Sequence, residues 1–250
     1  MRIVFWGSER GCGVTSNMLI VSTYLACRKG YRIVMAQLAE EKEGIESYFP
    51  KIEEFYGKKY IGTLIRRQLY YVSMKEWERE KGTSLSELIK YLECNMDIVA
   101  MDLANRTDEE ARNLMRNVDL VVVNLKQEHA DFDRYYAKYA SLSKKMFLLI
   151  GNYYENEYCN KESFQKKYRI PKEQLGVIPY NPEYQVVCAK GCLDSYIRRI
   201  QSKFLSGIKE QFLKEVENAA EQIYLTAAAE EDASWIVFIH KYIKWIEKKR

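Results

Sequence analysis

The apolar residues of this chain gather in short runs that alternate with stretches of helical periodicity. Six runs predict β-strands, at residues 2–6, 31–37, 97–103, 118–125, 145–151 and 175–179. Several of these runs are apolar at consecutive positions, which is typical of strands covered on both faces. Buried strands that alternate with helices predict an α/β fold with a doubly wound, mostly parallel sheet, followed here by a helical C-terminal extension.

Helix starts are marked by side chains suited to capping. Ser84 with Glu87, and Thr107 with Glu110, have the capping-box spacing, in which each side chain accepts a hydrogen bond from an otherwise unpaired backbone N–H group. A further helix is predicted at residues 16–29, directly after the first strand.

The domain organisation follows from the distribution of these patterns. Residues 40–82 mix Lys, Glu and Tyr with scattered apolar positions, so the sequence predicts no element there. From residue 194 the pattern is helical, with a break at 229–232. We therefore expect an α/β domain at residues 1–204 and a helical extension at 205–250, packed on the domain or next to it.

Composition and charge limit the functional classes. The chain has 250 residues, of which 47% are hydrophobic and 30% charged, so it is globular, and its cysteines are expected to be reduced thiols. The net charge of +4 equals the five basic residues minus one acidic residue of the last ten positions. The remainder is neutral, which argues against a nucleic-acid partner. The first apolar run is too short for a signal peptide, so a cytoplasmic location is expected.

The loop after the first strand carries the candidate chemistry. The strand reaches Gly7, and the loop that follows contains Gly11 and Gly13 immediately before a helix. Glycines in this context let backbone N–H groups turn inward, and the helix N-terminus adds further donors and a partial positive charge. This arrangement is typical of phosphate binding. Thr15 lies where a P-loop places the hydroxyl group that binds Mg²⁺.

This loop resembles the deviant Walker A motif, K-G-G-x-G-K-[ST]-[ST], of the MinD/ParA superfamily of P-loop ATPases. Gly11, Gly13, Thr15 and Ser16 match the motif, and Cys12 occupies its variable position. The resemblance implies that the segment 11–16 holds the phosphates of ATP.

Both lysines of the motif are absent. Glu9 stands at the signature lysine, Arg10 at a glycine, and Val14 at the lysine that contacts the terminal phosphates. The second strand also departs from the family, because Gln37 and Ala39 replace its two acidic residues. These losses predict weak or absent hydrolysis, since a lysine paired with phosphate contributes about 1.5–3 kcal/mol and stabilises charge in the transition state.

Three later landmarks continue the resemblance. The strand at 97–103 contains Asp102, which corresponds to the acid that orders Mg²⁺ and the attacking water. Asn152 follows the next-to-last strand, where the family reads adenine, and Pro179 ends the last strand beside the base. The landmarks occur in the family's order and cover residues 1 to about 195.

The resemblance thus implies ATP and Mg²⁺ as cofactors. The residues implied in nucleotide binding are Gly11, Cys12, Gly13, Val14, Thr15, Ser16, Asn152 and Pro179. Thr15 and Asp102 are the implied Mg²⁺ ligands, and Asp102 is the one candidate catalytic residue.

A P-loop that has lost its lysines resembles that of the TadZ/CpaE group, which positions the assembly machinery of Tad-type pili. The resemblance therefore implies a nucleotide-responsive protein that positions or assembles a cellular machine, with protein partners and a homodimer as candidate interactions. The alternative is a protein-interaction scaffold that no longer binds nucleotide. An active partitioning ATPase on DNA fits less well, because the lysines are missing.

The last residues, 235–250, combine apolar positions at helical spacing with five basic side chains. This pattern is found in helices that lie on anionic membranes, and MinD-like proteins end in such a helix. It is also typical of a helix that packs on its own domain with lysines on the outer side. Both interpretations stay open, so a peripheral membrane contact is retained as an alternative.

Overall fold

A computed structural model of the chain describes residues 1–38, 45, 63–66, 68–73, 84–142, 145–155, 158–193, 196 and 208–229. Its centre is an eight-stranded sheet in the order β3-β4-β2-β5-β1-β6-β7-β8. The strands are β1 (Arg2–Gly7), β2 (Ile33–Gln37), β3 (Thr63–Arg66), β4 (Leu69–Ser73), β5 (Ile98–Asp102), β6 (Leu120–Leu125), β7 (Met146–Tyr153) and β8 (Leu175–Pro179). All neighbouring pairs are parallel except β3 and β4, which are antiparallel.

The sheet confirms the predicted fold class and the six predicted strands. The strands β3 and β4 come from the segment 40–82, for which the sequence predicts no element. They lie at one edge of the sheet, where β4 pairs with β2. Strand β3 is the edge strand, and an edge strand needs fewer apolar residues than a central one, which explains its weak sequence signal.

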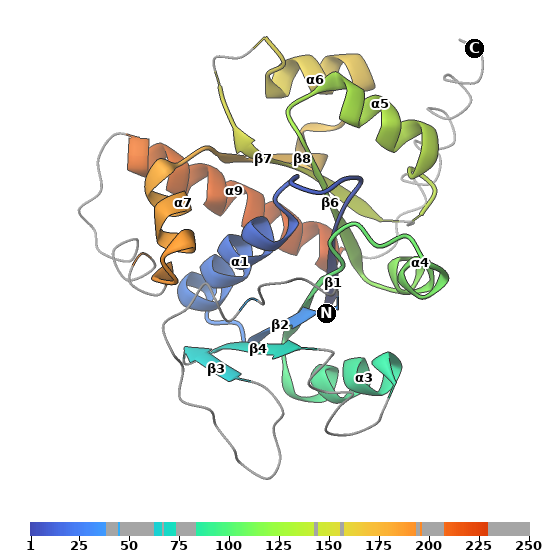
Figure 1. The fold of residues 1–250 in the computed structure, drawn as a ribbon, viewed down its shortest axis with the longest axis vertical. Coiled ribbons are helices and arrows are strands. Elements are labelled where there is room, and N and C mark those ends of the chain that lie inside the picture. The colour runs from blue at the N-terminus through green and yellow to red at the C-terminus, as the bar shows by residue number, and fades with distance from the viewer. Residues whose placement is uncertain are drawn as a thin grey trace.

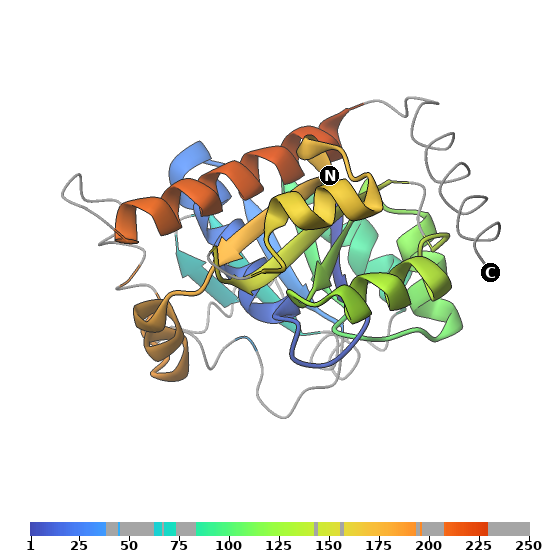
Figure 2. The ribbon, with the colours of Figure 1, turned by 90° about the horizontal axis from the view of Figure 1, so that it is seen from above.

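Helices cover both faces of the sheet (Figures 1 and 2). The α-helices are α1 (Val14–Tyr24), α3 (Leu85–Asn95), α4 (Glu109–Arg116), α5 (His129–Lys138), α6 (Lys161–Tyr168), α7 (Pro182–Ala189) and α9 (Ile208–Ala228). One buried apolar cluster joins α1 and α9 to the sheet, and a second joins α3, α4, α5 and α6 to its other face. This is the doubly wound arrangement, and it brings the carboxyl ends of the parallel strands to one edge.

Two of the predicted helix starts differ in the structure. At α3, the Ser84 N–H donates to the Glu87 carboxylate over 3.0 Å, as predicted. At α4, the prediction of Thr107 is wrong, because Asp108 is the N-cap and accepts from the Ala111 N–H over 3.1 Å. Helix α1 begins at Val14, two residues earlier than predicted, since Gly13 already has the left-handed conformation of a helix boundary.

Helix α9 packs across the sheet beside α1 and β8 (Figure 2). Ala219, Ala220 and Ile223 are buried there. A Cβ atom on Gly176 of β8 would lie 3.2 Å from the Ala219 Cβ, so the helix approaches the strand closely. The residues 208–229 therefore share an apolar core with the preceding domain. The boundary at 204/205 stays a prediction.

The segment 235–250 lies outside the described residues. Among the helices that the structure describes, none is both long and apolar enough to cross a membrane.

Candidate functional site

The loop between β1 and α1 has the backbone of an anion cradle. Gly11 and Gly13 have φ values of 79° and 83°, in the left-handed region that favours glycine. A Cβ atom on Gly11 would meet no atom within 4 Å, so its requirement for glycine comes from φ rather than from space. No side chain caps the N-terminus of α1, whose first-turn N–H groups follow directly on Gly13. Such a terminus provides donors and partial positive charge for a phosphate group.

Thr15 and Asp102 meet beside this cradle. The Thr15 hydroxyl donates to Asp102 Oδ2 over 2.6 Å, and Asp102 Oδ1 accepts from the Ala104 N–H over 2.8 Å. Strands β1 and β5 are neighbours, with Phe5 opposite Asp102, which sets the carboxylate against the loop. The carboxylate is buried at 1% exposure. A hydroxyl and a carboxylate are hard oxygen donors of the kind that Mg²⁺ prefers, so these two residues fit the metal.

Val14 and Cys12, which occupy the lysine position and the variable position of the motif, are both buried. A Cβ atom on Gly7 would lie 2.9 Å from the Val14 Cγ2 and collide with the Cys12 Sγ. The Cys12 thiol donates to the Glu9 carbonyl group over 3.0 Å, and burial raises its pKa to about 11. Cys12 is therefore a neutral thiol at pH 7. Val14 and Cys12 have only backbone N–H groups to offer a phosphate.

Glu9 is held by two cations that sequence reasoning did not identify. Its Oε2 lies 3.2 Å from the Lys126 ammonium group, and its Oε1 contacts the Arg134 guanidinium group. Lys126 follows β6 directly and Arg134 lies on α5. The available signal was the position of Lys126 at the carboxyl end of a parallel strand, which is the same edge of the sheet as the loop. Arg10 is exposed.

Asp131 connects the loop to α5. Its side chain is buried and accepts from the Ser8 hydroxyl group and, over 2.7 Å, from the Lys126 N–H. Because α5 is anchored in the second apolar cluster through Phe132 and Tyr135, this link fixes the start of the loop relative to the sheet.

Gln37 has a structural role at the position of the family's acid. Its Oε1 accepts from the Ile45 N–H over 3.2 Å and from the Tyr71 hydroxyl group over 3.0 Å. The side chain is buried. It therefore joins β2 to β4 and to Ile45, and it brings no negative charge to the site.

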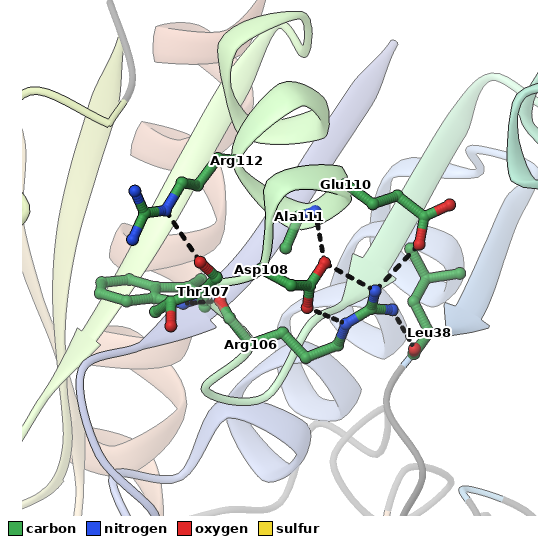
Figure 3. A network of polar contacts seen from close by, with 8 residues as sticks. Leu38, Arg106, Thr107, Asp108, Glu110, Ala111 and Arg112 are labelled. Carbon is green, nitrogen blue, oxygen red and sulfur yellow. Dashed lines mark hydrogen bonds and ion pairs between the residues drawn. The ribbon is translucent and has the colours of Figure 1, made fainter.

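Arg106 joins the segment after Asp102 to Leu38, the residue that follows β2 (Figure 3). The guanidinium group donates to the Leu38 carbonyl group over 2.8 Å and pairs with Asp108 and Glu110. The two carboxylates raise the Arg106 pKa, and the Arg106 hydrogen bonds lower the Asp108 pKa well below its usual range. This network fixes the position of the backbone that follows Asp102.

The base-side residues lie on neighbouring strands. Tyr153 pairs in register with Pro179, so Asn152 and Pro179 come to the same edge of the sheet. Asn152 has a φ of 50° and is exposed, and its Oδ1 accepts from Gln185 Nε2 over 2.8 Å. The structure thus brings the two predicted residues together, with the Asn152 amide oxygen engaged by α7.

A pair of tyrosines lies next to them. The rings of Tyr154 and Tyr180 stack with their centroids 5.0 Å apart and 20° between their planes. They are 46% and 38% exposed. Each directly follows the last residue of its strand, so they flank the edge that carries Asn152 and Pro179.

The fold of this chain recurs in solved structures. The ParA family ATPase from Chlorobium tepidum TLS superposes with a TM-score of 0.64 at 12% identity, over 88% of this chain and 98% of that chain. A putative plasmid partition protein from Borrelia burgdorferi B31 bound to AMPPNP gives 0.59 at 17% identity, over 90% and 98%. The septum site-determining protein MinD from Pyrococcus horikoshii OT3, complexed with Mg-ADP, gives 0.58 at 14% identity, over 91% and 98%.

The chain has the fold of the ParA and MinD ATPases. No protein-family model matches the sequence, and no curated protein matches it. At identities of 12–17% the likeness is one of fold, so the chemistry has to be argued from this chain's own residues.

Proposed function

We propose that this protein binds an adenine nucleotide with Mg²⁺ at residues 11–16. The observation that carries the proposal is the 2.6 Å contact between Thr15 and Asp102 beside the left-handed glycines and the uncapped start of α1. Backbone N–H groups would hold the phosphates, and the two oxygen ligands would hold the metal. The structural neighbours bound to AMPPNP and to Mg-ADP support this proposal.

Asn152 and Pro179 would contact the base, and the bound metal would supply charge neutralisation for the phosphates. Asp102 is the one candidate for orienting a water molecule. The chain offers no charge at Val14 or Gln37, so we expect turnover to be slow or absent.

Measuring phosphate release tests the hydrolysis part of the proposal. We expect the wild-type protein to release phosphate with a turnover far below the ~1 s⁻¹ at the lower end of typical enzymes. Steady release at or above that rate, abolished by Asp102→Ala, would show that other groups replace the missing lysines.

The cellular role that this site suggests is the positioning or assembly of a cellular machine, controlled by the bound nucleotide. A role of the TadZ/CpaE kind, in Tad-type pili, is the specific form that the loop resemblance suggests. Protein partners and a homodimer belong to the same proposal, and a peripheral membrane contact through residues 235–250 remains an alternative to packing of that segment. The rival function, a scaffold without nucleotide, is favoured by the buried Val14.

Isothermal titration with MgATP and MgADP decides between the two functions. We expect saturable binding that Thr15→Ala weakens about tenfold or more, equivalent to about 1.4 kcal/mol, while Thr15→Ser retains it because the hydroxyl is kept. Thr107→Ala is the matched control, because Thr107 lies outside the cradle. The affinity of this variant for the nucleotide should equal that of the wild type. No binding by the folded wild-type protein would favour the scaffold.

A further inference from the structure

Two cations lie beside the loop on separate elements. Lys126 comes directly after β6 and Arg134 is on α5, and both Figure 1 and Figure 2 show the dark blue loop after β1 running beside the green α5. Both cations pair with Glu9. The side chains of Lys126, Arg134 and Glu9 are 34%, 33% and 38% exposed, so all three are accessible to a ligand in solution.

The backbones that carry these cations are fixed. Buried Asp131 accepts from the Lys126 N–H and also lies 3.4 Å from Arg134 Nη1. Among the described residues, Glu9 is the ion-pair partner of the Lys126 ammonium group, and Arg134 divides its guanidinium group between Glu9 and Asp131. A change of partner therefore needs side-chain rotation only, without movement of β6 or α5.

The charges of these residues act on the centre of the loop. Cys12 lies between the two left-handed glycines, and after burial the Asp131 charge raises its thiol pKa, while the Lys126 charge lowers it by less. The cluster of Lys126, Arg134, Asp131 and Glu9 is neutral as it stands. Loss of Glu9 from the cluster leaves one positive charge directly beside the predicted phosphate cradle.

We propose that Lys126 and Arg134 are the cations that contact the terminal phosphate of a nucleotide held at residues 11–16, and that Glu9 competes with that phosphate for them. This inference rests on the proposed function and assigns to this chain's own residues the charge that Val14 does not supply. On binding, the phosphate replaces the Glu9 carboxylate as the acceptor of the Lys126 and Arg134 hydrogen bonds.

The exchange is favourable on general grounds. A phosphate group carries more negative charge than a carboxylate and offers an arginine more acceptor oxygens. Ion pairs that are one-third exposed stabilise little, so the loss of the Glu9 pairs opposes binding only weakly. Because the competition is one of charge, affinity should rise with the total negative charge of the phosphate chain, which is larger for ATP than for ADP.

Calorimetric titrations of Glu9→Gln test the competition. We expect the dissociation constant for MgATP to fall about three- to tenfold, the effect of a modest ion pair, with a smaller fall for MgADP. Glu128→Gln is the matched control, because it removes the same charge near Lys126 from an exposed residue, and it should change the affinity less than about twofold.

A double-mutant cycle identifies the cations. In a Lys126→Gln/Arg134→Gln background we expect weaker binding of MgATP and no gain from Glu9→Gln. Thermal unfolding of each variant checks that it is folded. A gain of the same size in that background, or equal effects of Glu9→Gln and Glu128→Gln, would overturn the inference while leaving nucleotide binding intact. Binding by none of the folded variants, the wild type included, would refute the proposed function as well.

Discussion

Gly13 shapes the candidate site through its backbone conformation. Its φ of 83° aims the following N–H groups into the loop, and a Cβ atom there would lie 3.3 Å from the Ser16 Oγ. An alanine that kept this conformation would strain the backbone by about 1–2 kcal/mol. Alternatively, the backbone would rotate toward negative φ. Either response misplaces the donors of the cradle.

We therefore expect Gly13→Ala to abolish measurable binding of MgATP and to lower the free energy of unfolding by about 1–2 kcal/mol. Gly191→Ala is the matched control, because Gly191 has a φ of 63° outside the loop. It should lose comparable stability and retain nucleotide binding. Equal affinity in both variants would argue against a backbone cradle at Gly13.

At the level of elements, α4 depends on Asp108 for two interactions. The carboxylate caps the helix at the Ala111 N–H and also pairs with Arg106 (Figure 3). Asp108→Ala removes both and should cost about 1–2 kcal/mol in a urea titration. Asp108→Asn keeps the capping oxygen and loses only a partly exposed ion pair, so we expect it to cost less than about 1 kcal/mol. Equal losses would mean that the cap contributes nothing.

The same carboxylate predicts a pH dependence. Hydrogen bonds from Arg106 hold the Asp108 pKa below its unfolded value of about 3.9, so the folded state favours the ionised form. This contribution is complete above the unfolded pKa and is lost as the pH falls below it. Unfolding free energy should decrease more steeply below about pH 4 in the wild type than in Asp108→Asn. Parallel curves would contradict this assignment.

The element scale also separates what sequence could predict from what it could not. The glycine pattern and Asp102 were predictable, because strand ends and helix starts fix local geometry. The N-cap of α4 was predicted one residue early, because Thr107 and Asp108 both have side chains that can cap a helix. In the structure Asp108 accepts from the Ala111 N–H and also pairs with Arg106. The partners of Glu9 are 117 and 125 positions away, and such distances carry no local signal.

At the scale of the whole molecule, α9 belongs to the apolar core that supports α1 and therefore the loop. Ile223 is fully buried, whereas Leu225 on the same helix is 65% exposed. We expect Ile223→Ala to destabilise the protein by about 2–4 kcal/mol in a single unfolding transition. Leu225→Ala should change stability by less than about 0.5 kcal/mol. Two separate transitions in the wild type would instead show that α9 folds independently of the sheet.

The central claim is that backbone N–H groups at residues 11–16 hold a nucleotide phosphate, and amide chemical shifts report on those groups directly. In ¹H–¹⁵N correlation spectra of the labelled protein titrated with MgATP, we predict the largest shifts at Gly11, Gly13 and Thr15, with saturation at one nucleotide per chain. The Gly191 amide should not move. Unchanged loop amides at saturating MgATP, or shifts confined to another part of the chain, would contradict the account.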